Sequence, residues 1–201
     1  MNPDRSAITH LWLRWAMLNG IAGTMVGALE AGGLQFAATL LLTGLFLGTA
    51  QWFVLRSRLR RSLYWIGASA VGWIVGVQVV ILLRPIISPI VVLLTQWSGL
   101  EVFWLNLIQQ PLRLILVGLA QWLVLRQFGA AAIWIGSSAV GGLVQGGVSV
   151  MICAVACLIL TAAGGAIWAT AVVYGMGWLS YGVMTGITMQ QLIQTNRLEV
   201  R

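Results

Sequence analysis

The chain has 201 residues, of which 60% are hydrophobic and only 7% are charged, and its mean hydropathy is +0.95. A water-soluble domain cannot cover that much apolar surface, so the composition excludes an ordinary soluble protein and predicts a chain that lies mainly in lipid. The net charge of +7 comes entirely from arginine. Arginines at the ends of apolar segments act as topology determinants and phospholipid anchors, so this charge does not predict nucleic-acid binding.

The apolar segments predict a single transmembrane domain that covers residues 1–201. At about 20 apolar residues per spanning helix, the chain has room for about six spans. In chain order, we expect helices at 12–32, 34–55, 63–83, 105–125, 133–161 and 166–193. The connection at 84–104 contains two prolines and only a short apolar stretch. We therefore expect it to be irregular and to lie on the outer membrane surface or against the bundle. The expected fold class is an all-α integral membrane bundle.

The arginines predict the orientation of this bundle. With six spans, the N-terminus, the turns at 56–62 and 126–132 and the C-terminus lie on one side of the membrane. That side would hold Arg5, Arg56, Arg58, Arg60, Arg61, Arg126, Arg197 and Arg201. On the opposite side, only Arg84 is expected to lie fully outside the membrane. The positive-inside rule then places both termini in the cytoplasm. The basic turn of Arg56, Arg58, Arg60 and Arg61 is expected to face anionic lipid headgroups.

Two copies of one hexapeptide indicate an internal repeat: QWFVLR at 51–56 and QWLVLR at 121–126. Each follows a glycine by three residues, and each is followed by a related segment, WIGASAVG at 65–72 and WIGSSAVG at 134–141. These copies predict three tandem two-helix hairpins in the same orientation, the first and last of them degraded. Trp15 corresponds to the tryptophan that opens the related segments, and Gln190 and Gln191 correspond to the glutamine of the hexapeptide.

The repeated residues Gln51, Trp52, Gln121 and Trp122 allow two interpretations. The glutamines lie inside the membrane boundary and need hydrogen-bond partners, so they either clamp neighbouring helices or converge on a polar ligand near the axis. The tryptophans are typical of an aromatic belt. Pairs of glycines four residues apart occur on every expected helix except the fourth. We expect them to allow close packing within the bundle, with an oligomer interface as the alternative.

Arg113 is the main candidate for a functional site. It lies 13 residues before Arg126 on the same expected helix, about 20 Å deeper at 1.5 Å per residue. An arginine inside a membrane usually faces the bundle interior and marks a functional site. We expect a polar site of Arg113, Glu30, Glu101 and Gln110, in which Glu30 or Glu101 pairs with the arginine. The alternative is that Arg113 extends outward to the headgroups.

The remaining reactive residues do not predict catalysis. Cys153 and Cys157 lie one helical turn apart in an apolar run, and we expect small packing residues rather than a disulfide or a metal site. His10 is the only histidine, and the few acidic residues stand apart. We therefore expect a protein that is not an enzyme, and no cofactor is identified.

The hexapeptide copies and their following segments resemble a repeat in small bacterial, cyanobacterial-type polytopic membrane proteins. The resemblance covers about residues 44–76 and 118–146 and implies a multi-pass protein of a bacterial inner or thylakoid membrane, without supplying catalytic residues. Three functions stay open. The first is an accessory or assembly subunit that contacts a larger membrane complex as well as lipids. The second is a small transporter or substrate-binding subunit with a polar site near Arg113. The third is a protein that contacts a pigment, a quinone or a lipid.

Overall fold

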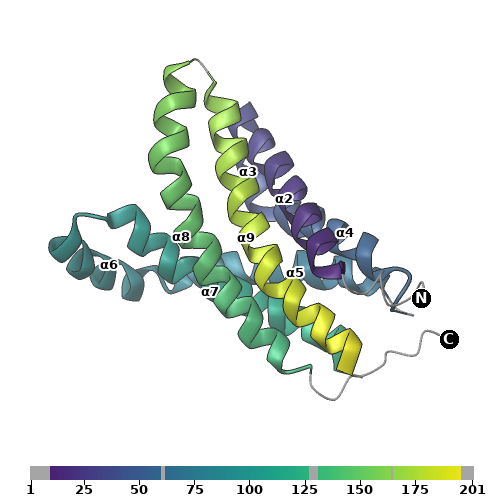
Figure 1. The fold of residues 1–201 in the computed structure, drawn as a ribbon. Helices are drawn as coiled ribbons and strands as arrows, with labels where there is room; N and C mark the ends of the chain where they lie inside the picture. The colour runs from purple at the N-terminus through teal and green to yellow at the C-terminus, as the bar shows by residue number, and fades with distance from the viewer. Residues whose placement is uncertain (1–9, 60–61, 127–130, 164, 196–201) are drawn as a thin grey trace.

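A computed structural model describes residues 10–59, 62–126, 131–163 and 165–195. Every regular element in these ranges is helical, so the prediction of an all-α fold is confirmed for the described part of the chain (Figure 1). Helices suit an apolar chain because a helix satisfies its own backbone hydrogen bonds where no water is present. The long helices are α2 (Leu11–Leu29), α4 (Thr43–Leu55), α5 (Leu63–Leu82), α7 (Glu101–Leu125), α8 (Ile133–Ala162) and α9 (Ala166–Thr195).

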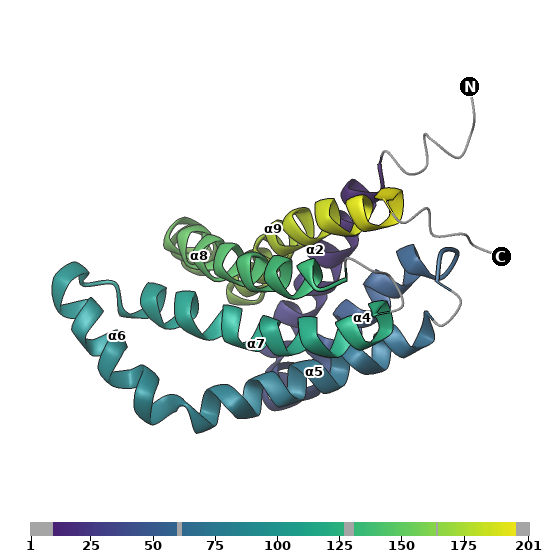
Figure 2. The ribbon, with the colours of Figure 1, turned by 90° about the horizontal axis from the view of Figure 1, so that it is seen from below.

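These six helices form a closed ring. Each packs against the next in the order α2, α4, α5, α7, α8 and α9, and α9 packs along α2 to complete it. The view from below shows α5 and α7 side by side, with α8, α9 and α2 stacked beyond them (Figure 2). A ring of neighbours leaves one face of every helix directed at a common interior and the opposite face directed outward.

The first two helices are joined by a tight bend instead of a loop. A π-helical turn, η1 (Glu30–Leu34), is followed by a short α3 (Gln35–Ala37) and a second π-helical turn, η2 (Ala38–Leu42). Gly33 carries the bend with a φ of 98°, a left-handed conformation that glycine adopts without steric cost. The expected helices 12–32 and 34–55 meet at this same glycine.

The connection between α5 and α7 differs from the expectation. Residues 84–104 were expected to be irregular, but they contain a 15-residue helix, α6 (Arg84–Ser98), and α7 begins at Glu101 instead of 105. Pro85 lies in the first turn of α6, where its missing N–H is not needed. Gly99 ends the helix with a φ of 70°, which is a common helix terminus. Helix α6 packs mainly on α7 and projects from the ring (Figure 2).

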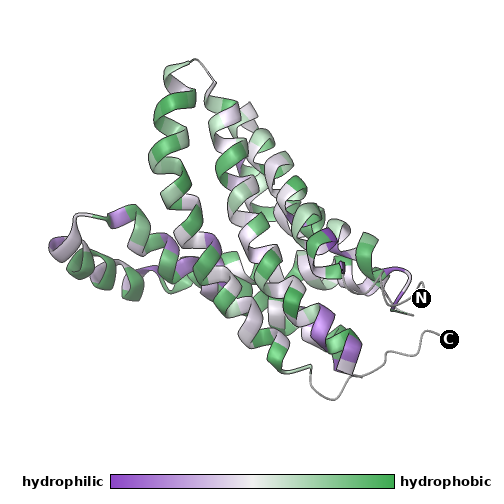
Figure 3. Cartoon of the chain, viewed as in Figure 1, coloured by the Kyte–Doolittle hydropathy of each residue, from purple (hydrophilic) through white to green (hydrophobic). Residues whose placement is uncertain are grey.

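Four helical stretches in the described residues are long and apolar enough to cross a membrane. They are Leu11–Leu55, which includes the bend at Gly33, and Leu63–Leu82, Glu101–Leu125 and Ile133–Ala162. Their outward faces are apolar: Leu158 on α8, for example, is 74% exposed. Figure 3 shows the end of α8 that leads into α9 as mostly hydrophobic. These properties are compatible with a membrane protein.

Paired glycines lie where the ring helices touch. In each of five pairs, a Cβ added to the first glycine would lie 2.6–2.8 Å from an atom of the neighbouring helix, closer than real Cβ atoms approach. Only glycine permits such contact between helix backbones. The glycines and the residues that they meet are Gly23 and Trp178, Gly44 and Ala70, Gly72 and Val117, Gly142 and Pro111, and Gly182 and Ala16.

Candidate functional site

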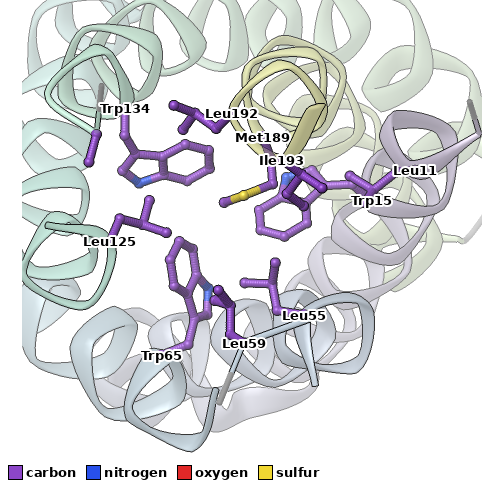
Figure 4. Packing of buried hydrophobic residues seen from close by; sticks show 11 residues of the cluster. Leu11, Trp15, Leu55, Leu59, Trp65, Leu125, Trp134, Met189, Leu192 and Ile193 are labelled. Atoms are coloured by element: carbon purple, nitrogen blue, oxygen red, sulfur yellow. The ribbon is translucent and has the colours of Figure 1, made fainter. Parts of the chain in front are cut away.

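Three buried tryptophans meet inside the ring, near the start of α2, α5 and α8. Trp15, Trp65 and Trp134 are each fully buried and pack edge to face, with ring centroids 5.5–6.0 Å apart (Figure 4). Edge-to-face packing is the favourable arrangement for aromatic rings. We call these three residues the indole cluster. Leucines from α2, α4 and α7 and residues of α9 surround it, which closes this end of the ring interior (Figure 4).

Each indole N–H donates a hydrogen bond to the preceding helix around the ring. Trp65 donates to Oε1 of Gln51 on α4 at 2.8 Å, and Trp134 donates to Oε1 of Gln121 on α7 at 2.9 Å. Trp15 donates to Oγ1 of Thr185 on α9 at 3.0 Å. A buried indole needs such an acceptor. The cluster therefore ties three pairs of adjacent helices together.

Thr185, the acceptor for Trp15, is not the residue that the sequence predicted for this position of the repeat. It follows Gly182 by three positions, the same spacing that separates the hexapeptide glutamines from their glycines. We expected Gln190 and Gln191 to correspond to those glutamines, but the acceptor for Trp15 is the threonine. The three-residue spacing from Gly182 could have identified this position in the sequence. It was missed because the residue there is a threonine and not a glutamine.

The two hexapeptide glutamines bind protein groups with both ends of their amides. Gln51 donates from Nε2 to Oδ1 of Asn19 at 2.8 Å. Gln121 donates from Nε2 to Oε1 of Gln51 at 3.0 Å and to Oγ of Ser69 at 2.8 Å. Both side chains are buried. Their polar atoms connect helices to one another, which corresponds to the clamp and not to a ligand site.

The tryptophans that follow these glutamines lie at the rim of the ring. Trp52 donates to Oγ of Ser62 at 3.1 Å, and the guanidinium of Arg56 lies 5.7 Å from its ring. Trp122 is partly buried and packs against the apolar residues around the indole cluster. Arg58 lies in the turn that follows α4, and Arg60 and Arg61 lie outside the described residues.

The other half of the ring, away from the indole cluster, contains a partly open cavity of about 510 Å³. We call it the polar cavity, because residues from four ring helices and the bend bring polar groups into it. Its polar lining residues are Glu30, Thr39, Thr43, Asn106, Gln110, Arg113, Gln145, Ser149 and Tyr174. Trp73 and Trp178, whose rings are 5.6 Å apart, form part of its wall. Its volume is within the range of small-molecule sites, about 300–1,000 Å³.

Four buried polar atoms of this lining have no hydrogen-bond partner in the described part of the chain. They are Oε1 of Gln110 and Nε of Arg113 on α7, and Oε1 of Gln145 and Oγ of Ser149 on α8. Gln145 as a whole is only 4% exposed. Buried polar atoms are nearly always satisfied in proteins, and each unsatisfied one costs about 1–3 kcal/mol. Four of the seven such atoms in the described residues belong to residues that line this cavity, so unsatisfied polar groups concentrate there.

Glu30 and Arg113 both line the polar cavity, but they do not pair. Oε2 of Glu30 accepts a hydrogen bond from the Tyr174 hydroxyl at 2.5 Å, and Nη2 of Arg113 donates to Oε1 of Gln109 at 3.1 Å. No ion pair within 4 Å joins the two charged groups, although both residues are described. The expected pairing of Arg113 with Glu30 is therefore wrong at the level of direct contact. Instead, Tyr174 binds the carboxylate of Glu30 and Gln109 binds the guanidinium of Arg113.

Glu101, the other expected partner, does not reach this cavity. It is the first residue of α7 and is exposed. Twelve residues separate it from Arg113, about 18 Å along one helix at 1.5 Å per residue. Of the four residues expected in a polar site, the fold thus brings together Arg113, Glu30 and Gln110. Sequence reasoning missed Tyr174 and Ser149, because only the packing of α8 and α9 brings them to this side.

The two cysteines differ from the expectation. Cys153 and Cys157 are bonded through their sulfurs on α8, with Cα atoms 4.8 Å apart, and neither is buried. Their interpretation as packing residues without a disulfide is therefore wrong. Residues four apart lie on the same face of a helix, so their side chains meet directly. Cys153 also lines the polar cavity.

Comparison with known proteins adds no assignment: no family model, curated protein or solved structure matches the chain. The resemblance to small polytopic membrane proteins of bacteria therefore stays a prediction. The candidate site rests on its own geometry.

Proposed function

We propose that this protein binds a small molecule within the membrane, in the polar cavity. The supporting observation is that four residues with unpartnered buried polar atoms, on α7 and α8, line one cavity. In a bilayer, the surroundings offer no water to replace a missing partner, so leaving these atoms empty is costly. A bound ligand, or the water that it displaces, supplies the partners. The role is binding, as in a transporter or a substrate-capturing subunit.

The proposal includes a membrane topology. All six ring helices span, in three hairpins that carry the repeat, and both termini face the cytoplasm. The supports are the ring order, the apolar outward faces and the arginine distribution. In this orientation the indole cluster lies near the cytoplasmic side and the polar cavity in the outer half of the membrane. A ligand would then enter from outside or from the outer leaflet.

The test of this function is ligand retention by the purified protein. We expect native mass spectrometry of the full chain, extracted in mild detergent, to detect a bound small molecule. We also expect an extract of cellular small molecules to raise its thermal midpoint. The variant Ala154→Phe places a large side chain in the cavity lining and should abolish both effects.

A matched control is available on the same helix. Val155 is the next residue, is exposed, and does not line the polar cavity, so Val155→Phe should retain the ligand. If no small molecule binds to the wild-type chain, or if Ala154→Phe and Val155→Phe behave alike, the polar cavity is not a binding site. Either result would overturn the proposal.

A second candidate function, an accessory subunit of a larger complex, is favoured by α6. This helix projects from the ring and exposes apolar residues, among them Ile86, Leu93 and Trp97, which is 87% exposed. Such a face suits a membrane surface or a partner protein. We expect a partner bound here to co-purify with the wild-type chain and to be lost from a variant with Leu93→Ser and Trp97→Ser. Isolation of the wild-type chain alone would count against this role.

A further inference from the structure

The polar cavity contains one positive and one negative side chain that do not form a direct ion pair. Arg113 and Glu30 both line it, and no ion pair within 4 Å joins them. In a low-dielectric site, two opposite charges normally pair, because an unpaired charge there is costly. A ligand that carries both charges would compensate both residues at once. This inference rests on the proposed function and concerns the same site.

The Arg113 side of the cavity suits a carboxylate. One guanidinium nitrogen, Nη2, is used by Gln109, whereas the buried Nε has no partner. The guanidinium presents its N–H groups as a planar fork that matches the two oxygens of a carboxylate.

The remaining polar groups suit an ammonium. Glu30 accepts one hydrogen bond from Tyr174, and Oε1 of Gln110 and Oε1 of Gln145 accept none. These three acceptors match a group that has several N–H donors and no acceptor, as an ammonium has. The rings of Trp73 and Trp178 in the wall are further surfaces that attract a cation.

Ligands of a single charge fit less well. A simple anion would bring a second negative charge toward Glu30 and would leave both glutamine oxygens without donors. A simple cation would face the positive charge of Arg113, whose Nε would stay without an acceptor. An uncharged apolar molecule would leave all four buried polar atoms unsatisfied.

We therefore propose that the polar cavity binds a small zwitterion, a molecule with one carboxylate and one ammonium group. The carboxylate lies at Arg113. The ammonium lies toward Glu30 and the free oxygens of Gln110 and Gln145. A short apolar group of the ligand packs against Trp73 and Trp178. Free α-amino acids are the chemical class that meets these requirements.

The test compares ligands that differ in one charged end. The full chain in lipid nanodiscs is titrated calorimetrically with L-leucine, L-phenylalanine and L-alanine. The amino acid that binds most tightly is then compared with its amide, which lacks the carboxylate, and with its N-acetyl form, which lacks the ammonium. We expect each analogue to bind at least about 10-fold more weakly than the zwitterion, which corresponds to about 1.4 kcal/mol.

Two variants assign each end of the ligand to its residue. Arg113→Gln should remove the preference for the amino acid over its amide and keep the preference over the N-acetyl form. Glu30→Gln should do the reverse. The matched controls are Arg126→Gln and Glu101→Gln, at exposed positions outside the cavity, which should bind like the wild type. Preference ratios are read only from variants that stay monodisperse, so a general loss of folding does not imitate the result.

Three outcomes would overturn the zwitterion. The first is that the N-acetyl form binds as well as the amino acid, which shows a site for anions. The second is that the amide binds as well, which shows a site for cations. The third is that none of the three probes binds. In each case the proposed function is judged separately, by ligand retention in the wild type and its loss in Ala154→Phe. A different retained ligand would preserve that function and reject only this class.

Discussion

Gln121 donates a hydrogen bond from its side-chain nitrogen to the side-chain oxygen of Gln51 at 3.0 Å. The corresponding residues of two hexapeptides 70 residues apart in the chain thus bind each other inside the ring. The same oxygen of Gln51 also accepts the indole N–H of Trp65. The relationship connects the repeat in the sequence to the centre of the fold, because each copy completes the hydrogen bonding of the other.

Removing the amide of Gln121 should therefore destabilise the bundle. Gln121→Met keeps the length of the side chain but leaves the buried Trp134 N–H without its acceptor. We expect a loss between about 0.6 kcal/mol, the average for hydrogen bonds between membrane helices, and about 3 kcal/mol for an unsatisfied buried group. Unfolding of the purified protein in mixed micelles measures this difference.

A double-mutant cycle with Trp134→Phe isolates the contact. Once the indole N–H is absent, Gln121→Met should cost less than it does in the wild type. Gln96→Met is the control, since Gln96 lies on α6 and is exposed. An effect of Gln121→Met no larger than that of Gln96→Met would contradict the clamp.

Two glycines of α5 should respond in opposite ways to substitution by alanine. A Cβ at Gly76 would lie 2.8–2.9 Å from the backbone of Arg113, whereas a Cβ at Gly67 would meet nothing within 4 Å. Gly76→Ala should push α5 away from α7, lower the thermal midpoint and weaken ligand binding in the polar cavity. Gly67→Ala should be neutral or stabilising by up to about 1 kcal/mol, because alanine is the better helix former. Equal midpoints for both variants would show that the close packing at Gly76 is unimportant.

Much of the fold could be predicted because long apolar helices leave strong local signals. The apolar runs predicted where the long helices lie. Helix α7, for example, begins at Glu101, only four residues before the predicted start at 105. Helix α6 was missed because its prolines suggested a break. Pro85 falls in the first turn, where a helix tolerates it. Sequence patterns do not show which turn of a helix a proline will occupy until the start of that helix is known.

The candidate site could be predicted only in part, for a different reason. Arg113, Glu30 and Gln110 stood out because polar residues are rare in this chain, but the partner of Glu30 depends on how α9 packs along α2. That packing brings Tyr174 to Glu30, at a separation of 144 residues. Thr185 was missed because threonine does not resemble the glutamine whose place it takes. Tertiary contacts of this kind leave no local pattern.

The hydrogen bond between Tyr174 and Glu30 should couple the bend to α9. It joins a carboxylate to a hydroxyl, and hydrogen bonds to charged groups contribute about 1.5–3 kcal/mol. We expect Tyr174→Phe and Glu30→Gln each to lower the free energy of unfolding. The double variant should lose less than the sum of the two single losses. Tyr64→Phe is the control, because Tyr64 is 67% exposed.

The same measurement separates this contact from the pairing of Glu30 with Arg113. Since no ion pair within 4 Å joins those two residues, Glu30→Gln should couple less strongly to Arg113→Leu than to Tyr174→Phe. A double variant that recovers much of the loss of each single one would show a direct pair between Glu30 and Arg113. It would then contradict the arrangement in which Tyr174 binds the carboxylate.

The last prediction concerns the side of the membrane on which each turn lies. Arg58 follows α4, and Trp97 lies near the end of α6, one long helix further along the chain. If α5 spans the membrane, the two positions face opposite sides, and the positive-inside rule places Arg58 in the cytoplasm. Single cysteines at 58 and 97, in a chain with Cys153→Ser and Cys157→Ser, can be tested with a membrane-impermeant maleimide.

We expect the cysteine at 97 to react in intact cells and the cysteine at 58 to react only after lysis. Position 97 is well suited to this test because its side chain is 87% exposed. Denatured samples of both variants show that each thiol is present and free to react. Reaction of both positions from the same side would mean that α5 does not cross the membrane. The polar cavity would then not lie at the depth where its unpartnered atoms are cut off from water, and the physical reason for a bound ligand would be lost.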